Sequence, residues 1–298
     1  MSQTISSVSG PTIQSRLALL ALLLGGVAIG GSPIFVRLSE VGPLATAFWR
    51  VTLALIPLFI VSVAQRRQSV ARPTRLADYA MLVLPGVFLA VDLATWHLAI
   101  GLTSVANATL LANLAPVFVT LIGWLLFRSA VTKIFLSGLM IAIAGVVILK
   151  GGPLALGNGD MRGDGLAVLA AACYAGYILA IGRLRSRFDT LRIMLWSSAA
   201  AAVCIFPIVI AFEGNLFPAT LHGWAVLFGL AFISHAGGQV AITYALAYLP
   251  AAFSSLTLLL QPVVAAVLAW LLLGETIGTM QAIGGIIVLT GILIARRG

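Results

Sequence analysis

The chain has 298 residues, of which 61% are hydrophobic and 8% are charged, and its formal net charge is +9. So few charged residues cannot cover the surface of an ordinary water-soluble domain. The composition therefore excludes that class and predicts a protein embedded in a membrane.

Apolar segments follow one another with short connections, and each is long enough to cross a bilayer as a helix of about 20 residues. Residues 1–15 precede the first segment and are expected to form a disordered cytoplasmic tail. The first segment lacks a cleavage-site pattern, so we expect it to be retained. The ten predicted spans are 16–37, 43–64, 78–100, 103–127, 131–150, 165–185, 191–211, 221–248, 251–273 and 277–295.

The distribution of Lys and Arg predicts the orientation of the spans, because short cytoplasmic loops are enriched in both residues. With a cytoplasmic N-terminus, the outer face carries only Arg37, Lys150 and Arg162, and Arg50 lies within a span. Both termini are then predicted to be cytoplasmic, and the positive charge reports topology rather than a nucleic-acid partner. The basic residues on the cytoplasmic face are Arg16, Arg66, Arg67, Arg72, Arg75, Arg128, Lys133, Arg183, Arg185, Arg187, Arg192, Arg296 and Arg297.

The sequence contains an internal repeat, since Pro116 recurs as Pro262, 146 residues later. The spacing divides the chain into two five-helix repeats, residues 16–150 and 165–298, joined by a connecting loop at 151–164. Five is an odd number, so the second repeat must enter the membrane with the opposite orientation. The same spacing relates Leu20 to Leu166, Ala21 to Ala167, Gly30 to Gly176, Arg37 to Arg183, Ala106 to Ala252, Leu110 to Leu256, Val117 to Val263, Trp124 to Trp270, Gly138 to Gly284 and Gly145 to Gly291.

The predicted fold is therefore an all-α membrane protein, in which ten transmembrane helices form two inverted five-helix repeats around a central cavity. Inverted repeats are typical of transporters that work by alternating access, with a binding site near the midplane where interrupted helices meet. Asn113 and Gln261 lie near mid-membrane in matched spans, each beside a proline, Pro116 or Pro262. Because proline leaves a carbonyl one turn earlier without its helical donor, these four residues are predicted to bind the solute.

Other polar and aromatic residues inside the spans are further candidates for the binding site. Trp96 and His97 either face a cavity or only pack against neighbouring helices. Tyr174 and Tyr177 share one helix face, so they either bridge helices or offer rings to a substrate. Ser32, in the first span, is included among the predicted substrate-binding residues.

Three titratable residues inside the spans suggest roles beyond packing. Arg50 and Asp92 are predicted at similar depth, and a lone charge there is unfavourable by several kcal/mol. We therefore expect an ion pair that either pins two helices together or gates the outer mouth and meets a charged substrate group. His235 is either a structural histidine or a group that couples export to protons.

Several other features indicate packing rather than chemistry. Cys173 and Cys204 lie inside spans and are expected to be small buried hydrophobes. The segment 158–165 is a glycine-rich turn, and no metal site or cofactor is expected. Small residues that should allow close helix contacts are Gly138, Gly145, Gly284, Gly285 and Gly291.

Two sets of motifs carry a family resemblance. They are Gly30-Gly-Ser-Pro-Ile-Phe-Val-Arg37 with Ala45-Thr-Ala-Phe-Trp-Arg50, and Leu256-Thr-Leu-Leu-Leu-Gln-Pro262 with Leu271-Leu-Leu-Gly-Glu275, Gly284 and Gly291. They resemble the drug/metabolite transporter superfamily, specifically its ten-span EamA-like branch, over nearly the whole chain from Arg16. The first half departs from the pattern, with Arg128-Ser129 where the family usually has Gly-Glu.

Within that superfamily the chain is most similar to the bacterial aromatic amino-acid exporters of the YddG type. The resemblance implies ten helices around a central cavity and efflux across the bacterial inner membrane. It also implies amino acids or related amphiphilic compounds as cargo.

These observations predict an inner-membrane transporter that exports small organic solutes, including aromatic amino acids, as a monomer or weak homo-oligomer in the lipid bilayer. Lys occurs only at Lys133 and Lys150, near membrane edges, which argues against phosphate-bearing cargo. The alternatives are an exporter of other drugs or metabolites, such as amphiphilic or cationic compounds, a channel, or a non-transporting receptor or structural subunit. An enzyme is not expected, because no intramembrane histidine or carboxylate has a catalytic spacing.

Overall fold

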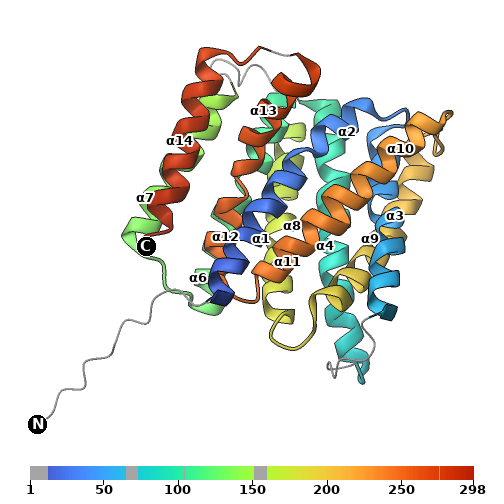
Figure 1. The fold of residues 1–298 in the computed structure, drawn as a ribbon, viewed down its shortest axis with the longest axis horizontal. Helices are drawn as coiled ribbons and strands as arrows, with labels where there is room; N and C mark the ends of the chain where they lie inside the picture. The colour runs from blue at the N-terminus through green and yellow to red at the C-terminus, as the bar shows by residue number, and fades with distance from the viewer. Residues whose placement is uncertain (1–12, 65–72, 104, 151–159, 275) are drawn as a thin grey trace, which may run out of the picture.

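The computed structural model describes residues 13–64, 73–103, 105–150, 160–274 and 276–298, and every regular element in these ranges is a helix (Figure 1). Most of the predicted N-terminal tail and of the 151–164 loop lies outside the described residues, as do Arg66, Arg67, Arg72 and Glu275. The helices are α1 (Ile13–Gly30), α2 (Ser32–Leu38), α3 (Pro43–Ala64), α4 (Leu76–Leu102), α5 (Val105–Ala112), α6 (Ala115–Phe127), α7 (Lys133–Leu149), α8 (Met161–Leu184), α9 (Thr190–Phe212), α10 (Leu221–Gly229), the π-helix η2 (Leu230–Gln239), α11 (Val240–Ala245), α12 (Ala251–Thr257), α13 (Leu260–Leu273) and α14 (Thr279–Ala295).

The described helices confirm a protein that crosses the membrane several times. Eight helical stretches are long and apolar enough to span a bilayer. The other two predicted spans correspond to the shorter apolar helices α7 and α14, which have 17 residues each. Helices of that length lie at the lower limit for crossing a hydrocarbon core of about 30 Å.

Prolines determine where the predicted spans are interrupted. Pro33, Pro116 and Pro262 each lie in the first turn of a new helix, where the missing N–H breaks no helical hydrogen bond. The fourth predicted span accordingly divides into α5 and α6 and the ninth into α12 and α13. The expected interruptions of matched helices are therefore confirmed.

Glycines bring α7 and α14 into close contact, and the glycine spacing had predicted a close helix contact for each without naming its partner. A Cβ added to Gly138 would lie 2.7 Å from the Gly291 carbonyl oxygen, and one added to Gly145 would lie 2.9 Å from that of Gly284. The pairing runs in opposite directions along the two helices, so α7 and α14 are antiparallel. Gly284 is the repeat counterpart of Gly138, and Gly291 is that of Gly145. Exchanging the two repeats therefore turns one contact into the other, which is the pattern of a two-fold relationship.

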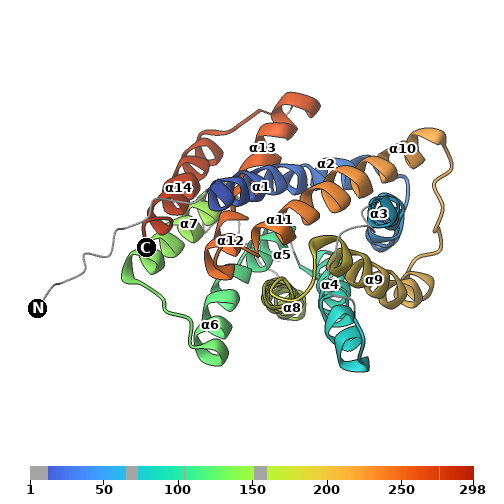
Figure 2. The same ribbon diagram turned by 60° about the horizontal axis from the view of Figure 1, so that its bottom comes forward.

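The remaining packing follows the same relationship (Figures 1 and 2). Helix α4 packs against α8 and α9, and its counterparts η2 and α11 pack against α1, with η2 also on α3. The counterpart helices α3 and α9 pack against each other, at the opposite end of the molecule from α7 and α14. Helices from the two halves of the chain thus interleave around one main core.

Two carboxylates join the halves at the connections α2–α3 and α9–α10. Glu213 accepts hydrogen bonds from the backbone N–H groups of Leu44 and Ala45, at 2.7 and 2.8 Å, in the first turn of α3. Glu40 accepts from the backbone N–H groups of Ala219 and Thr220, each at 3.0 Å, and from the Thr220 hydroxyl, just before α10. The Thr220 hydroxyl holds the pKa of Glu40 below its usual value. Glu213 therefore caps α3, and Glu40 holds the N-cap residue of α10, Thr220, so each half is bonded to the start of a helix of the other.

The glycine contact between α7 and α14 predicts a strong size limit. Gly145→Ala should lower the free energy of unfolding by about 1–3 kcal/mol, because the new Cβ would lie 2.5 Å from the Val288 nitrogen. Thermal unfolding of the purified protein in detergent measures this change. Gly165→Ala, in the first turn and a half of α8, is the matched control, because its Cβ would meet nothing within 4 Å. Equal melting temperatures for the two variants would contradict the close contact.

Candidate functional site

Helices α3 and α4 bring two opposite charges into the interior of the bundle. Arg50 on α3 and Asp92 on α4 are both half-buried and interact electrostatically. The Nε atom of Arg50 is fully buried and has no hydrogen-bond partner. A buried guanidinium donor without an acceptor is unfavourable, so this group is suited to bind an acceptor that arrives from outside.

The ion pair expected between these residues is not formed directly. Within the described part of the chain, ion pairs closer than 4.0 Å join Arg187 to Asp78 and Arg192 to Asp189, but none joins Arg50 to Asp92. The two charges therefore share a region of the interior while each remains available to another group.

Two tyrosines on α8 face the same region. The rings of Tyr174 and Tyr177 stack at a centroid distance of 5.8 Å, as expected for residues on one helix face, and both interact with the charge of Arg50. Tyr177 is completely buried, and its hydroxyl accepts a hydrogen bond of 2.9 Å from the Gln239 amide of η2. Tyr174 is only half-buried. In this conformation Tyr177 bridges two helices and Tyr174 is the more accessible ring.

Trp96 and His97 follow Asp92 by about one turn of α4. Their rings meet edge to face at 4.9 Å, and both side chains are half-buried. The Nδ1 atom of His97 lies within hydrogen-bond distance of the Leu93 carbonyl, and the ring interacts with the charge of Arg50. The structure therefore brings both residues to the Arg50 region.

His235 lies on η2 and is hydrogen-bonded within the core. Its Nε2 atom is 2.8 Å from the Ser198 hydroxyl of α9, and only 1% of its surface is exposed. The hydrogen bond pairs one ring nitrogen of His235, and the choice between a structural and a proton-coupling role stays a prediction. Sequence reasoning did not select Ser198, although it matches Thr52 at the repeat spacing and lies beside Ser197 in a mostly apolar helix.

The residues at the interrupted helices form a second group. The Asn113 amide, in the turn after α5, donates a hydrogen bond of 2.8 Å to the Thr109 carbonyl of α5, and Gln261 is half-buried. The Ser32 hydroxyl is buried without a partner. Pro116 is buried in α6, and Pro262 lines a pocket of about 350 Å³ between α2, α7, α13 and α14. No hydrogen bond, ion pair or ring contact joins these five described residues to the Arg50 region.

The described residues also include side chains of the types that bind metal ions. No group of three or more His, Cys, Asp or Glu side chains within these ranges is arranged to hold a metal ion. Cys173 and Cys204 are free thiols and are half-buried in α8 and α9.

Comparison with known proteins gives consistent results. The chain is 28% identical to the probable terminal-alkyne amino-acid exporter of Streptantibioticus cattleyicolor, over 89% of this chain and 87% of that protein. It is 26% identical to the pseudopaline exporter CntI of Pseudomonas aeruginosa, over 73% of this chain and 75% of that protein. One crystal structure superposes with a TM-score of 0.80 at 18% identity and covers 95% of this chain and 98% of that one, which establishes the fold.

A family model for EamA-like transporters matches residues 16–150 and again residues 161–297, which together make up most of the chain. The two matched ranges have nearly equal length and follow one another in sequence. The chain belongs to the EamA-like transporter family.

Proposed function

We propose that the protein exports amino acids, including aromatic ones, across the bacterial inner membrane by alternating access. Membership of a transporter family and similarity to proteins named as exporters of an amino acid and of pseudopaline support a small-metabolite exporter. The chemistry of the interior supports the finer assignment.

The observation that carries this assignment is the pair of unpaired opposite charges at Arg50 and Asp92. An amino acid carries a carboxylate and an ammonium group on one carbon, so it can satisfy both charges at once. A guanidinium binds a carboxylate through charge-assisted hydrogen bonds, and a carboxylate binds an ammonium in the same way. An aromatic side chain of the solute would then contact Trp96, one turn after Asp92 on α4, and Tyr174 on α8.

The transport mechanism rests on two inverted repeats, with ten spans and both termini in the cytoplasm. The antiparallel contact of α7 with its counterpart α14 supports inversion, because equivalent helices of repeats that point the same way would be parallel. The interleaved packing of the remaining counterpart helices is consistent with it. Exchanging the conformations of two such halves exposes a central site first to one side and then to the other.

An asymmetry between matched half-helices supports such an exchange. Helix α12 packs against α1, α6, α7, α8 and α14, whereas its counterpart α5 packs mainly against α8 and α4 and joins the cluster around α7 and α14 through Leu110. Residues Ser254 to Thr257 of α12 are correspondingly buried. We propose that α12 closes one side of the site in this conformation, and that α5 closes the other side in the alternate one. The residues Asn113, Pro116, Gln261, Pro262 and Ser32 would then serve as the flexible joints beside the site.

Selectivity between analogues tests the zwitterion site. Arg50→Gln should lower the preference for phenylalanine over phenethylamine, which lacks the carboxylate, by about tenfold to a hundredfold. Asp92→Asn should lower the preference for phenylalanine over 3-phenylpropionate, which lacks the ammonium, to a similar extent. Competition by each analogue against labelled phenylalanine efflux from proteoliposomes measures both ratios.

Arg16→Gln, at an exposed position in the first turn of α1, should leave both ratios unchanged. Because Arg50 and Asp92 are not in contact, the exchange of Arg50→Asp with Asp92→Arg should not restore transport. Restoration would indicate a direct pair instead, and wild-type protein that favours phenethylamine over phenylalanine would identify an exporter of cationic compounds.

Counterflow tests the carrier mechanism. Unlabelled phenylalanine inside proteoliposomes should accelerate the uptake of external labelled phenylalanine several-fold, because a loaded site returns faster than an empty one in an alternating-access carrier. A channel would give uptake that does not saturate and is not accelerated. A receptor or structural subunit would give no uptake above empty liposomes.

A further inference from the structure

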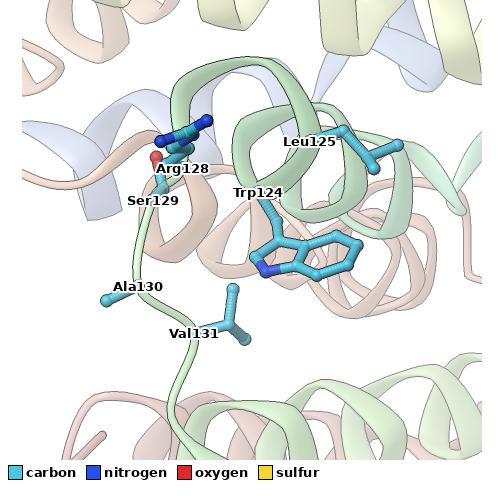
Figure 3. A pocket seen from close by; sticks show the side chains of 6 residues that line it. All are labelled: Trp124, Leu125, Arg128, Ser129, Ala130 and Val131. Carbon is cyan, nitrogen blue, oxygen red and sulfur yellow. The ribbon is translucent and has the colours of Figure 1, made fainter.

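A hollow lies where α6 ends and the chain turns into α7. Its volume is about 580 Å³, and it is lined by Trp124, Leu125, Arg128, Ser129, Ala130 and Val131 (Figure 3). The Trp124 ring and the Val131 side chain face each other across it, and Arg128 and Ser129 lie at the end where the helix stops (Figure 3). This hollow takes no part in the site around Arg50.

The surroundings of the hollow are those of a surface that faces lipid. The exposed fraction is 57% for Trp124, 59% for Leu125 and 71% for Leu126. Helix α6 packs against α8 and α12, and the connection at residues 128–132 runs from α6 to α7 (Figure 2). The counterpart helices α13 and α14 pack against each other. The space beside α6 is therefore suited to an acyl chain.

The backbone at Arg128 indicates that its side chain has a separate role. Arg128 ends α6 in the left-handed conformation with φ of 50°, and its repeat counterpart Gly274 ends α13 in the same way with φ of 69°. Glycine adopts this conformation without steric cost, whereas arginine does not. Glycine would therefore suit this turn better than arginine. Because Arg128 is held in an unfavoured backbone conformation, we expect its side chain to have a function.

Basic side chains gather at the end of the molecule where the hollow lies. Lys133 begins α7, and Gly298 lies against Thr132, which places the exposed Arg296 and Arg297 at the same end of the molecule. Helices α6, α7 and α14 contain no acidic residue. A phosphate group placed here would meet only favourable charges from these helices.

We propose that this hollow binds an anionic phospholipid from the adjacent leaflet. The phosphate would accept hydrogen bonds from the Arg128 guanidinium and the Ser129 hydroxyl, with the Trp124 indole at the headgroup level. One acyl chain would lie along Leu125 and Leu126 in the space beside α6. Only one of the two equivalent helix ends can do this, because Trp270 is similarly exposed, at 51%, but is followed by Gly274 rather than by arginine.

Quenching of tryptophan fluorescence tests the proposal in nanodiscs of phosphatidylcholine that contain a minor fraction of brominated lipid. Brominated phosphatidylglycerol should quench wild-type protein more than brominated phosphatidylcholine does. Trp124→Phe should remove this excess, and the matched control Trp270→Phe should preserve it. Arg128→Gly should reduce the preference for phosphatidylglycerol about fivefold, because one basic residue near the surface contributes that much to binding an anionic lipid.

Arg128→Gly should fold and melt at or above the wild-type temperature, because glycine suits the left-handed turn. Arg128→Lys, which keeps the charge, should retain most of the preference. The proposal is overturned if Arg128→Gly keeps the wild-type preference for phosphatidylglycerol. It is also overturned if Trp270→Phe removes the excess quenching as completely as Trp124→Phe.

Discussion

The interior of this bundle holds a guanidinium and a carboxylate that interact but do not touch. In a medium of low polarity each charge needs a partner, and a direct contact between Arg50 and Asp92 would supply one to both. The fold instead keeps them on neighbouring helices with the Nε atom of Arg50 unsatisfied. The surrounding aromatic rings and the tight helix contacts elsewhere hold this arrangement in place. A guanidinium and a carboxylate that are close but not in contact are suited to a solute that carries both a negative and a positive charge.

The scaffold is nearly symmetric, but its chemistry is not. The counterpart of Asp92 is Gly238, which packs against Gly25 of α1, and the counterpart of Arg50 is Trp196, whose ring meets Tyr79 at 5.1 Å. Tyr177 has Gly31 as its counterpart. The two charges thus come from one half, whereas the rings near them come from both halves, Trp96 from the first and Tyr174 from the second. A two-fold scaffold can therefore hold a chiral, asymmetric solute.

Sequence reasoning predicted the parts of the fold that depend on local chemistry. Hydropathy predicted where the spans lie, Pro116 and Pro262 predicted the interrupted helices, and the spacing of Gly138 and Gly145 predicted a close helix contact but not that α14 is the partner of α7. Other features depend on distances between helices, which one sequence does not encode locally. The separation of Arg50 from Asp92 and the hydrogen bond from Ser198 to His235 are of this kind. The π-helix η2 was also not predicted, because its sequence resembles an ordinary apolar helix and its geometry reflects packing against α1 and α3.

The reciprocal carboxylate bonds between the halves have a mechanical consequence. Glu40 and Glu213 tie the beginnings of α10 and α3 to loops of the opposite half, so this corner resists separation. A rearrangement that opens the bundle would leave this corner in place, and the other helices would rotate about it. The moving elements would be the interrupted helices α5–α6 and α12–α13, whose interruptions beside Pro116 and Pro262 lie away from this corner. Small rotations there would change access to the interior without breaking the bonds that hold the two halves together.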